Sequence, residues 1–299
     1  MNTPSQTNAA TSTRIGDYFV QRGRLTPSDI DAIAQLQESS GLRFGDAAVQ
    51  LGLLDATEVQ QALSEQYHYP TAPANIKLQP FAIASQANSS EAEAIRRLRT
   101  NIQLQQKLVN AYAIAVVGAR GNEKTTYVAT SLAIAFAQTG LSVLLINANL
   151  RQPSNKGLYN GRRAKGLSTV LSKRDSLNNC LNKDEFPNLS VLDAGPLPPN
   201  PAELLTAPTF QAVLNDAQAH FDVVLIDTPA SALYPDAVLI GQQANACLLV
   251  ARQHSSLLND VRETRNSLEA NGARLLGIVY NAQTEKALSE RRLRLTATR

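Results

Sequence analysis

The residues best suited to chemistry lie in one short loop, which runs from Gly118 to Thr125 as Gly-Ala-Arg-Gly-Asn-Glu-Lys-Thr. An apolar run that predicts a strand comes before this loop, and a stretch that predicts a helix follows it. A loop in this setting holds phosphate oxygens on backbone N–H groups at a helix N-terminus, while its lysine reaches the terminal phosphates. The pattern therefore predicts an ATP site. Its binding residues are Gly118, Gly121, Asn122, Glu123, Lys124, Thr125 and Thr126.

A carboxylate that could complete the site stands at the end of a second apolar run, where Asp227 follows Val-Val-Leu-Ile. We expect Asp227 and the Thr125 hydroxyl to hold Mg²⁺, and we expect Lys124 and Asp227 to be the catalytic residues. The loop departs from the pattern GxxxxGK[ST], because Glu123 stands where the pattern has its last glycine. Glutamate adds bulk where the backbone should meet phosphate, and it adds negative charge beside an anion. The alternative is a Rossmann-like domain whose Gly-rich turn binds no nucleotide.

Short apolar runs predict the strands that must position these residues. They cover 113–117, 142–146, 189–192, 223–226, 246–251 and 274–280. Amphipathic stretches near 125–139, 201–219, 234–242 and 257–270 separate most of them and predict helices. This alternation is typical of a parallel sheet with helices on both faces. We therefore predict an α/β fold: a P-loop NTPase domain with a mainly parallel sheet, preceded by a small helical domain.

The small helical domain is predicted from an internal repeat. The residues Arg-Ile-Gly-Asp at 14–17 recur as Arg-Phe-Gly-Asp at 43–46, an offset of 29. Within each unit, apolar residues at helical spacing are followed by a glycine that breaks the helix. Capping residues then begin a second helix at 26–29 and at 55–58. Residues 14–67 therefore read as two helix–turn–helix units.

The 299 residues and their ordinary composition suggest about two soluble domains. A net charge of +3 is too small to indicate nucleic-acid binding. Two cysteines without a secretory signal fit a reducing cytosol, and no apolar run approaches the ~20 residues of a transmembrane segment. We predict a disordered tail at 1–13, the helical domain at 14–70, a Pro-containing linker at 71–90, the P-loop domain at 91–284 and a basic tail at 285–299.

The region 93–283 resembles the bacterial tyrosine kinases (BY-kinases) of exopolysaccharide chain-length control, above all their stand-alone EpsG type. Glu93, Arg96 and Arg99 fit the E-x2-R-x2-R oligomerisation motif of that family. The segment LLINANLRQP at 144–153 resembles its second nucleotide motif, in which Arg151 contacts the nucleotide, and LPPNPAELL at 197–205 resembles its Pro-rich segment. The resemblance implies ATP and Mg²⁺ as cofactors, tyrosine autophosphorylation and a homo-oligomer. It also implies a Wzz-like membrane chain-length regulator as partner, so the protein would be cytoplasmic and peripheral at the inner membrane.

Two departures from the family bear on catalysis. Asn147 and Asn149 stand where relatives carry two aspartates that help to hold Mg²⁺ and to activate the tyrosine hydroxyl. An amide binds a hard cation more weakly than a carboxylate and cannot act as a general base at neutral pH. We therefore predict a degenerate kinase that acts as a regulator or scaffold. An active kinase that relies on Asp227, and a partitioning ATPase of the ParA/MinD type, are the alternatives.

The repeat at 14–66 resembles the MshEN domain of type II secretion and pilus ATPases, whose two 24-residue motifs flank a five-residue spacer. Several members of that family bind cyclic di-GMP. The resemblance implies that arginines stack on guanine or bind phosphate, and that glycines allow close approach of the ligand. In the alternative interpretation these residues serve folding and the domain only docks partners. The candidate residues are Arg14, Gly16, Gly23, Gln37, Arg43, Gly45, Gly52 and Gln66.

Overall fold

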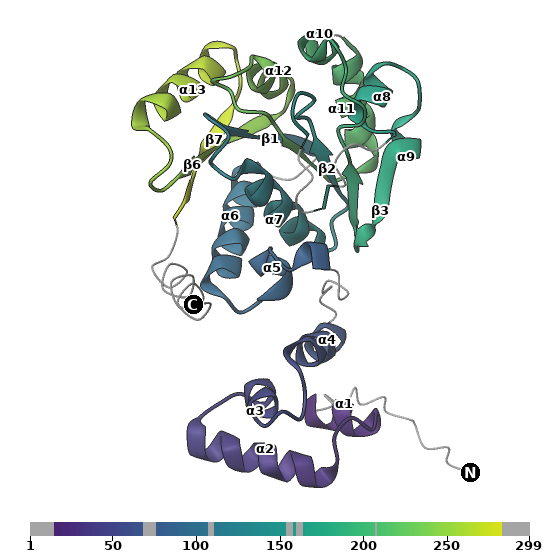
Figure 1. Cartoon of the computed structure of the whole chain (residues 1–299), viewed down its shortest axis with the longest axis vertical. Coiled ribbons are helices and arrows are strands. Elements are labelled where there is room, and N and C mark those ends of the chain that lie inside the picture. The colour runs from purple at the N-terminus through teal and green to yellow at the C-terminus, as the bar shows by residue number, and fades with distance from the viewer. Residues whose placement is uncertain are drawn as a thin grey trace, which may run out of the picture. The chain divides into compact units, whose positions relative to one another are not determined.

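The computed structural model describes residues 15–67, 76–106, 111–153, 158–159, 164–206 and 208–282. The chain divides into two compact units, Met1–Ala74 and Asn75–Arg299. The first contains the helices of the repeat, and the second contains the sheet with its own helices (Figure 1). Arg14 and both predicted tails lie outside the described residues.

The first unit consists of α1 (Ile15–Gln21), α2 (Pro27–Ser40), α3 (Phe44–Gln50) and α4 (Ala56–Tyr67), as the repeat predicts. The second helix of each repeat begins with a reciprocal capping box. The Thr26 N–H donates to Asp29 Oδ2 over 2.8 Å, and the Asp29 N–H donates to Thr26 Oγ1 over 3.3 Å. The repeat-related pair is Asp55 and Glu58, with distances of 3.0 and 2.8 Å. Both predicted helix starts are therefore confirmed.

The glycines of the repeat have structural roles in this unit. Gly23 and Gly52 adopt φ angles of +67° and +69° after α1 and α3, a conformation that favours glycine. Gly45 faces Val59 so closely that a Cβ atom there would clash with Val59 Cγ1. At Gly16 the nearest atom to such a Cβ would be Ile30 Cδ1 at 3.2 Å. These positions end helices or bring them together.

The second unit is built on a sheet with the strand order β3-β4-β2-β5-β1-β6-β7, counted over the described residues. The strands are β1 (Tyr112–Gly118), β2 (Val143–Asn147), β3 (Leu181–Phe186), β4 (Leu189–Leu192), β5 (Val223–Asp227), β6 (Ala246–Arg252) and β7 (Leu275–Asn281). All pairings are parallel except that of β3 with β4. The predicted fold class is therefore confirmed, with one antiparallel edge strand that the apolar runs did not predict.

Helices cover both faces of the sheet (Figure 1). One face packs against α7 (Thr125–Ala137), and α6 (Ser90–Gln106) packs on α7. The other face carries α8 (Leu167–Leu171), α9 (Leu177–Cys180), α10 (Pro201–Thr206), α11 (Pro208–His220), α12 (Asp236–Gln243) and α13 (Leu258–Ala270). Alternate residues of β1, namely Ala113, Ala115 and Val117, join the core beneath this second face. The continuous burial of β1 follows from cover on both sides.

The described part of the predicted linker, 76–90, is folded and packed instead of forming an extended linker. It forms η1 (Ile76–Leu78) and α5 (Ala82–Ser85), in which Leu78, Ala82, Ile83 and Ala84 are buried. Lys77 Nζ lies 2.6 Å from Glu185 Oε1, and Gln138 Nε2 donates to the Ile83 carbonyl over 3.1 Å. The prolines of this segment suggested a linker, but its apolar run Phe81–Ala84 is long enough to pack. The second unit therefore begins before the predicted boundary at residue 91.

Candidate nucleotide-binding site

The candidate site lies at the carboxyl ends of β1, β2 and β5, where parallel α/β sheets usually bind ligands. Asp227, at the end of β5, is in register with Val116 on one side and with Asn147 on the other. The predicted phosphate loop connects β1 to α7, and Lys124 is the residue before α7. The fold therefore brings the loop, Asp227 and Asn147 to one edge of the sheet.

The loop has an unusual backbone at its lysine. Lys124 has φ 62° and ψ 43°, which is a left-handed conformation that L side chains rarely adopt. Gly121 also has a positive φ, of 90°. The strained residue belongs to the loop and not to α7, because α7 begins only at Thr125. Backbone strain of this kind is often found at ligand-binding sites.

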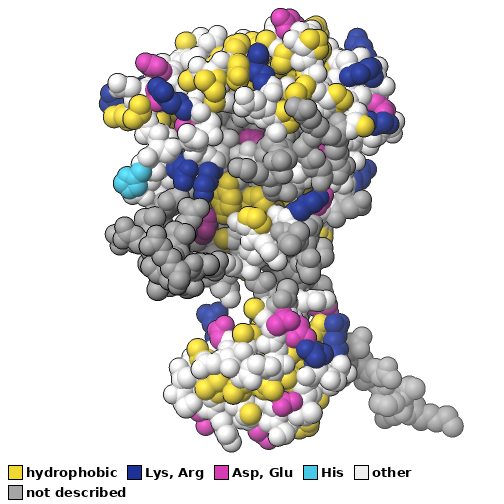
Figure 2. All heavy atoms as spheres, viewed as in Figure 1, with side chains coloured by type: hydrophobic (Ala, Val, Ile, Leu, Met, Phe, Trp, Pro, Cys, Tyr) yellow, Lys and Arg dark blue, Asp and Glu magenta, His cyan; other side chains and the backbone are white. Residues whose placement is uncertain are grey.

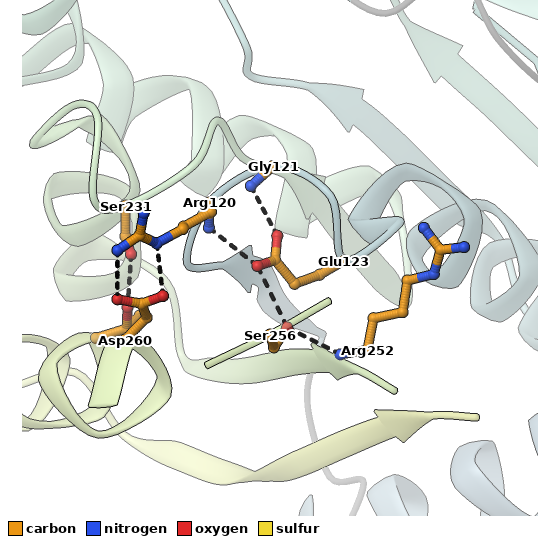
Figure 3. A network of polar contacts seen from close by, with 8 residues as sticks. Arg120, Gly121, Glu123, Ser231, Arg252, Ser256 and Asp260 are labelled. Carbon is orange, nitrogen blue, oxygen red and sulfur yellow. Dashed lines mark hydrogen bonds and ion pairs between the residues drawn. The ribbon is translucent and has the colours of Figure 1, made fainter. Parts of the chain in front are cut away.

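The Glu123 side chain folds back into the loop (Figure 3). Glu123 is only 1% exposed. Oε1 accepts a hydrogen bond from the Arg120 N–H over 3.0 Å, and Oε2 accepts one from the Gly121 N–H over 2.7 Å. The Ser256 hydroxyl donates to Oε1 over 3.4 Å. A carboxylate therefore already binds two backbone donors of the predicted phosphate loop.

Residues at the end of β6 and at the start of α13 hold the loop from a second side, and the sequence motifs did not predict them. Arg120 makes a bidentate ion pair with Asp260 at the start of α13, with distances of 2.5 and 2.8 Å (Figure 3). Arg252 Nη1 donates to the Asn122 carbonyl over 3.2 Å. These side chains come from segments without a recognisable motif, so no spacing signal could have identified them.

Asp227 is the buried carboxylate of the site. Its Oδ2 accepts a hydrogen bond from Thr126 Oγ1 over 2.7 Å, whereas Oδ1 is buried and has no hydrogen-bond partner among the described residues. Burial raises the pKa of Asp227 to about 7, although the hydrogen bond from Thr126 acts in the opposite direction. A buried carboxylate oxygen without a donor, next to threonine hydroxyls, fits a hard cation such as Mg²⁺. In the described part of the chain, no group of three or more His, Cys, Asp or Glu residues could hold a metal without further ligands.

The residues after β2 form a turn that uses its own side chains. Asn147 Oδ1 accepts from the Asn149 N–H over 3.2 Å, and Asn149 Oδ1 accepts from the Gln152 N–H over 2.9 Å. Arg151, a predicted nucleotide contact, makes a bidentate pair with the fully buried Asp236 at 2.8 and 2.9 Å. Its guanidinium also lies 4.3 Å from the centroid of the Tyr234 ring. The structure thus places Arg151 in contacts within the protein, and Asp236 is a site residue that the motifs missed.

The predicted oligomerisation residues lie on α6. Arg96 Nη1 lies 3.4 Å from Glu93 Oε2, and both side chains are partly exposed. Arg99 instead donates to the Ala135 carbonyl of α7 over 2.9 Å. Glu93 is therefore exposed on α6 and Arg96 is half-buried beside it, whereas Arg99 joins α6 to α7.

The predicted cyclic di-GMP residues lie in the first unit. Gly16, Gly23, Gly45 and Gly52 have the packing and helix-ending roles described above. Gln37 Nε2 donates to the Leu42 carbonyl over 3.2 Å. Arg43 is exposed and lies just before α3. The two remaining candidates, Arg14 and the side chain of Gln66, lie outside the described residues.

The fold and the loop define a P-loop NTPase. The model of a family described as AAA domain matches residues 111–254. Tyrosine-protein kinase YwqD of Bacillus subtilis (strain 168) is 31% identical over 206 residues, which cover 69% of this chain and 87% of that protein. The chain therefore belongs to the family of bacterial tyrosine-protein kinases.

Further relatives agree with this family. Tyrosine-protein kinase etk of Escherichia coli (strain K12) is 30% identical over 70% of this chain, but the match spans only 29% of the length of that protein. The solved kinase domain of Escherichia coli ETK has a TM-score of 0.64 and 28% identity, covering 77% of this chain and 94% of that domain. The chimerical protein CapA2B2 has a TM-score of 0.63 and 26% identity, covering 74% and 97%.

Two surface properties bear on partners. Within the described ranges, no helix has the length and apolar character needed to cross a membrane. Among the described side chains coloured in Figure 2, basic and acidic residues are interspersed. This distribution agrees with the small net charge of +3.

Proposed function

We propose that this chain is a kinase-like regulator of polysaccharide production that has lost efficient phosphoryl transfer. The observation that carries the proposal is the buried carboxylate of Glu123, which binds two N–H groups of the phosphate loop. The family membership supports the kinase ancestry, and the neutral Asn147 beside Asp227 supports the loss of activity.

The chemistry expected of the remaining residues explains the loss. Lys124, Thr125 and Asp227 would hold ATP and Mg²⁺, and the cation neutralises charge that develops on the transferred phosphate. Asn147 and Asn149 cannot take a proton from a tyrosine hydroxyl at neutral pH, because an amide is not a base there. Phosphoryl transfer depends on positioning and charge neutralisation, so losses at three positions of one site should compound.

Phosphorylation assays on the purified full-length chain test this proposal. With ATP and Mg²⁺, the wild type should show no tyrosine phosphorylation and no ATP hydrolysis above a Lys124→Ala control. Hydrolysis is measured in parallel because it needs no acceptor tyrosine. The triple variant Glu123→Gly/Asn147→Asp/Asn149→Asp should gain at least about 100-fold in hydrolysis, the order of magnitude of one lost electrostatic contact in an active site.

The same assay distinguishes the alternative of an active kinase. Wild-type phosphorylation that disappears in both Lys124→Ala and Asp227→Asn would refute the proposal and favour catalysis through Asp227. In that case Asn147 and Asn149 would be substitutions that the site tolerates.

The proposed regulator acts with partners. Its predicted oligomer and its predicted partner, the cytoplasmic tail of a Wzz-like membrane regulator, would place it in the cytoplasm at the inner membrane. The exposed Glu93 and its half-buried neighbour Arg96 support α6 as the contact surface. In light scattering after size exclusion, Glu93→Ala/Arg96→Ala should lower the mass of any oligomer, whereas the exposed Gln105→Ala on the same helix should not. An unchanged mass in the double variant would remove α6 from the interface.

Cyclic di-GMP binding by the helical unit stays a prediction. The glycines that suggested it have roles in helix ends and helix packing, which the folding interpretation also explains. Calorimetry of the full chain with cyclic di-GMP tests it, with Arg43→Ala as the variant and Arg24→Ala as the matched control, since Arg24 Nε donates to Glu58 Oε1 over 2.7 Å within the unit. Heat that both variants retain would not come from the predicted arginine site.

A further inference from the structure

The phosphate loop carries its own anion. A phosphate in such a loop is held by backbone N–H groups, and each N–H group donates one strong hydrogen bond. Here the N–H groups of Arg120 and Gly121 already donate to the two carboxylate oxygens of Glu123, at 3.0 and 2.7 Å. The carboxylate and a nucleotide phosphate would therefore compete for donors of one loop.

Contacts from the far side make the carboxylate difficult to displace. The Ser256 hydroxyl donates to Glu123 Oε1 over 3.4 Å, and the Arg252 N–H donates to Ser256 Oγ over 3.0 Å. Asn281 Nδ2 donates to the Glu123 carbonyl over 3.4 Å. Residues of β6, the segment after it and β7 thus hold Glu123 from outside the loop, as Figure 3 shows for Ser256 and Arg252.

The space around the carboxylate is closed as well. A Cβ atom added at Gly118, the last residue of β1, would lie 3.0 Å from Glu123 Oε2. Glu123 as a whole residue is 1% exposed. The Glu123 side chain therefore fills the interior of the loop between its first glycine and its own backbone, where water or an ion would otherwise solvate the N–H groups.

We propose that Glu123 is an internal substitute for phosphate, which folds the loop without nucleotide and opposes the binding of ATP. The negative charge acts in the same direction as the competition for donors, because it repels the phosphates of an incoming nucleotide. This inference concerns binding, whereas the proposed function concerns transfer of phosphate, so either can fail without the other.

Anion rescue in the full-length chain tests the inference, with inorganic pyrophosphate as the probe and thermal unfolding as the readout. The wild type should not respond to millimolar pyrophosphate, because its donors are occupied. Glu123→Ala should unfold about 5 °C lower without the anion and should regain part of that loss when pyrophosphate is added. Glu123→Gln, which keeps one acceptor oxygen, should lie between the two. Glu269→Ala, which removes an exposed acid of α13 that pairs with Arg265, is the matched control and should behave as the wild type.

Nucleotide binding gives the second readout. ATP should bind to Glu123→Ala about 10- to 100-fold more tightly than to the wild type, because one nearby negative charge is removed. Tight ATP binding by the wild type, or a wild-type response to pyrophosphate equal to that of Glu123→Ala, would overturn the inference. If Glu123→Ala does not fold, the Glu123→Gln variant and the wild-type titration still decide. Glu123→Ala that binds ATP more tightly but does not hydrolyse it would support both proposals. A wild type that hydrolyses ATP but binds it weakly would refute only the proposed function.

Discussion

The buried Asp227 should make the second unit less stable as the pH rises. Burial raises the pKa of Asp227 from 3.8 to about 7 in the folded protein. A carboxyl with a raised folded-state pKa contributes stability that is fully present below the pKa of the unfolded chain. That contribution is lost as the pH rises through the folded-state pKa. We therefore expect the loss to develop between about pH 4 and pH 7.

The magnitude follows from the size of the shift. A rise of about three pH units corresponds to about 4 kcal/mol between protonated and ionised forms, at about 1.4 kcal/mol per unit. Asp227→Asn removes the titration but keeps an oxygen that can accept from Thr126, 2.7 Å away in the wild type. The variant should therefore be more stable than the wild type at pH 8, by up to this amount, and the difference should shrink toward pH 4.

Denaturant unfolding with chelator present measures this difference, and hydrogen exchange of the β5 amides assigns it to the second unit. Glu263→Gln, which neutralises an exposed acid of α13, serves as the control and should leave the pH dependence as in the wild type. Equal stability of Asp227→Asn and wild type at pH 8 would refute the reasoning, because it would mean that the folded protein accommodates the ionised carboxylate without cost.

Three further changes should affect stability in predictable directions. Lys124→Gly should stabilise the chain by about 0.5 to 1 kcal/mol in urea unfolding, because glycine adopts the left-handed backbone without strain. The comparison is Lys173→Gly, at an exposed position where the wild-type lysine has φ 57°. A destabilised Lys124→Gly would contradict the assigned strain. Asp236→Ala should cost about 2 to 3 kcal/mol, since it leaves a charged guanidinium without its buried partner; a change below about 0.5 kcal/mol would show that solvent replaces the pair. Gly45→Ala should destabilise the helical unit by about 1 to 3 kcal/mol in circular-dichroism melts, and Val59→Ala should relieve that loss; an unaffected single variant would refute the close packing.

Much of the sheet was predictable because its central strands are apolar on both faces. The runs at 113–117, 223–226 and 246–251 coincide with β1, β5 and β6, which lie side by side in the middle of the sheet. The edge strand β3 has the sequence Leu-Asn-Lys-Asp-Glu-Phe, so its polar residues conceal it. An edge strand needs less apolar surface, and charges there also discourage pairing with another chain.

The candidate site was predictable only where one segment of chain carried the information. The loop, Lys124 and Asp227 follow from strand ends and spacing, and the fold brings them together. The position of the Glu123 carboxylate did not follow. The motif identified the missing glycine, but Ser256 and Arg252, whose contacts hold the loop and this side chain, come from segments more than 100 residues away in the chain. Contacts of this kind are set by tertiary packing and leave no local pattern.

The joint between α6 and α7 links the surface of the second unit to its phosphate loop. Near the loop, Tyr127 on α7 donates to Glu91 on α6 over 2.8 Å and stacks on Phe81 at 5.3 Å. Near the other end of α7, Arg99 holds the Ala135 carbonyl. A partner that shifts α6 would pull on α7 at two points, and α7 starts where the strained loop ends. Binding of a partner to α6 is therefore expected to reach the phosphate loop through these contacts, without nucleotide turnover.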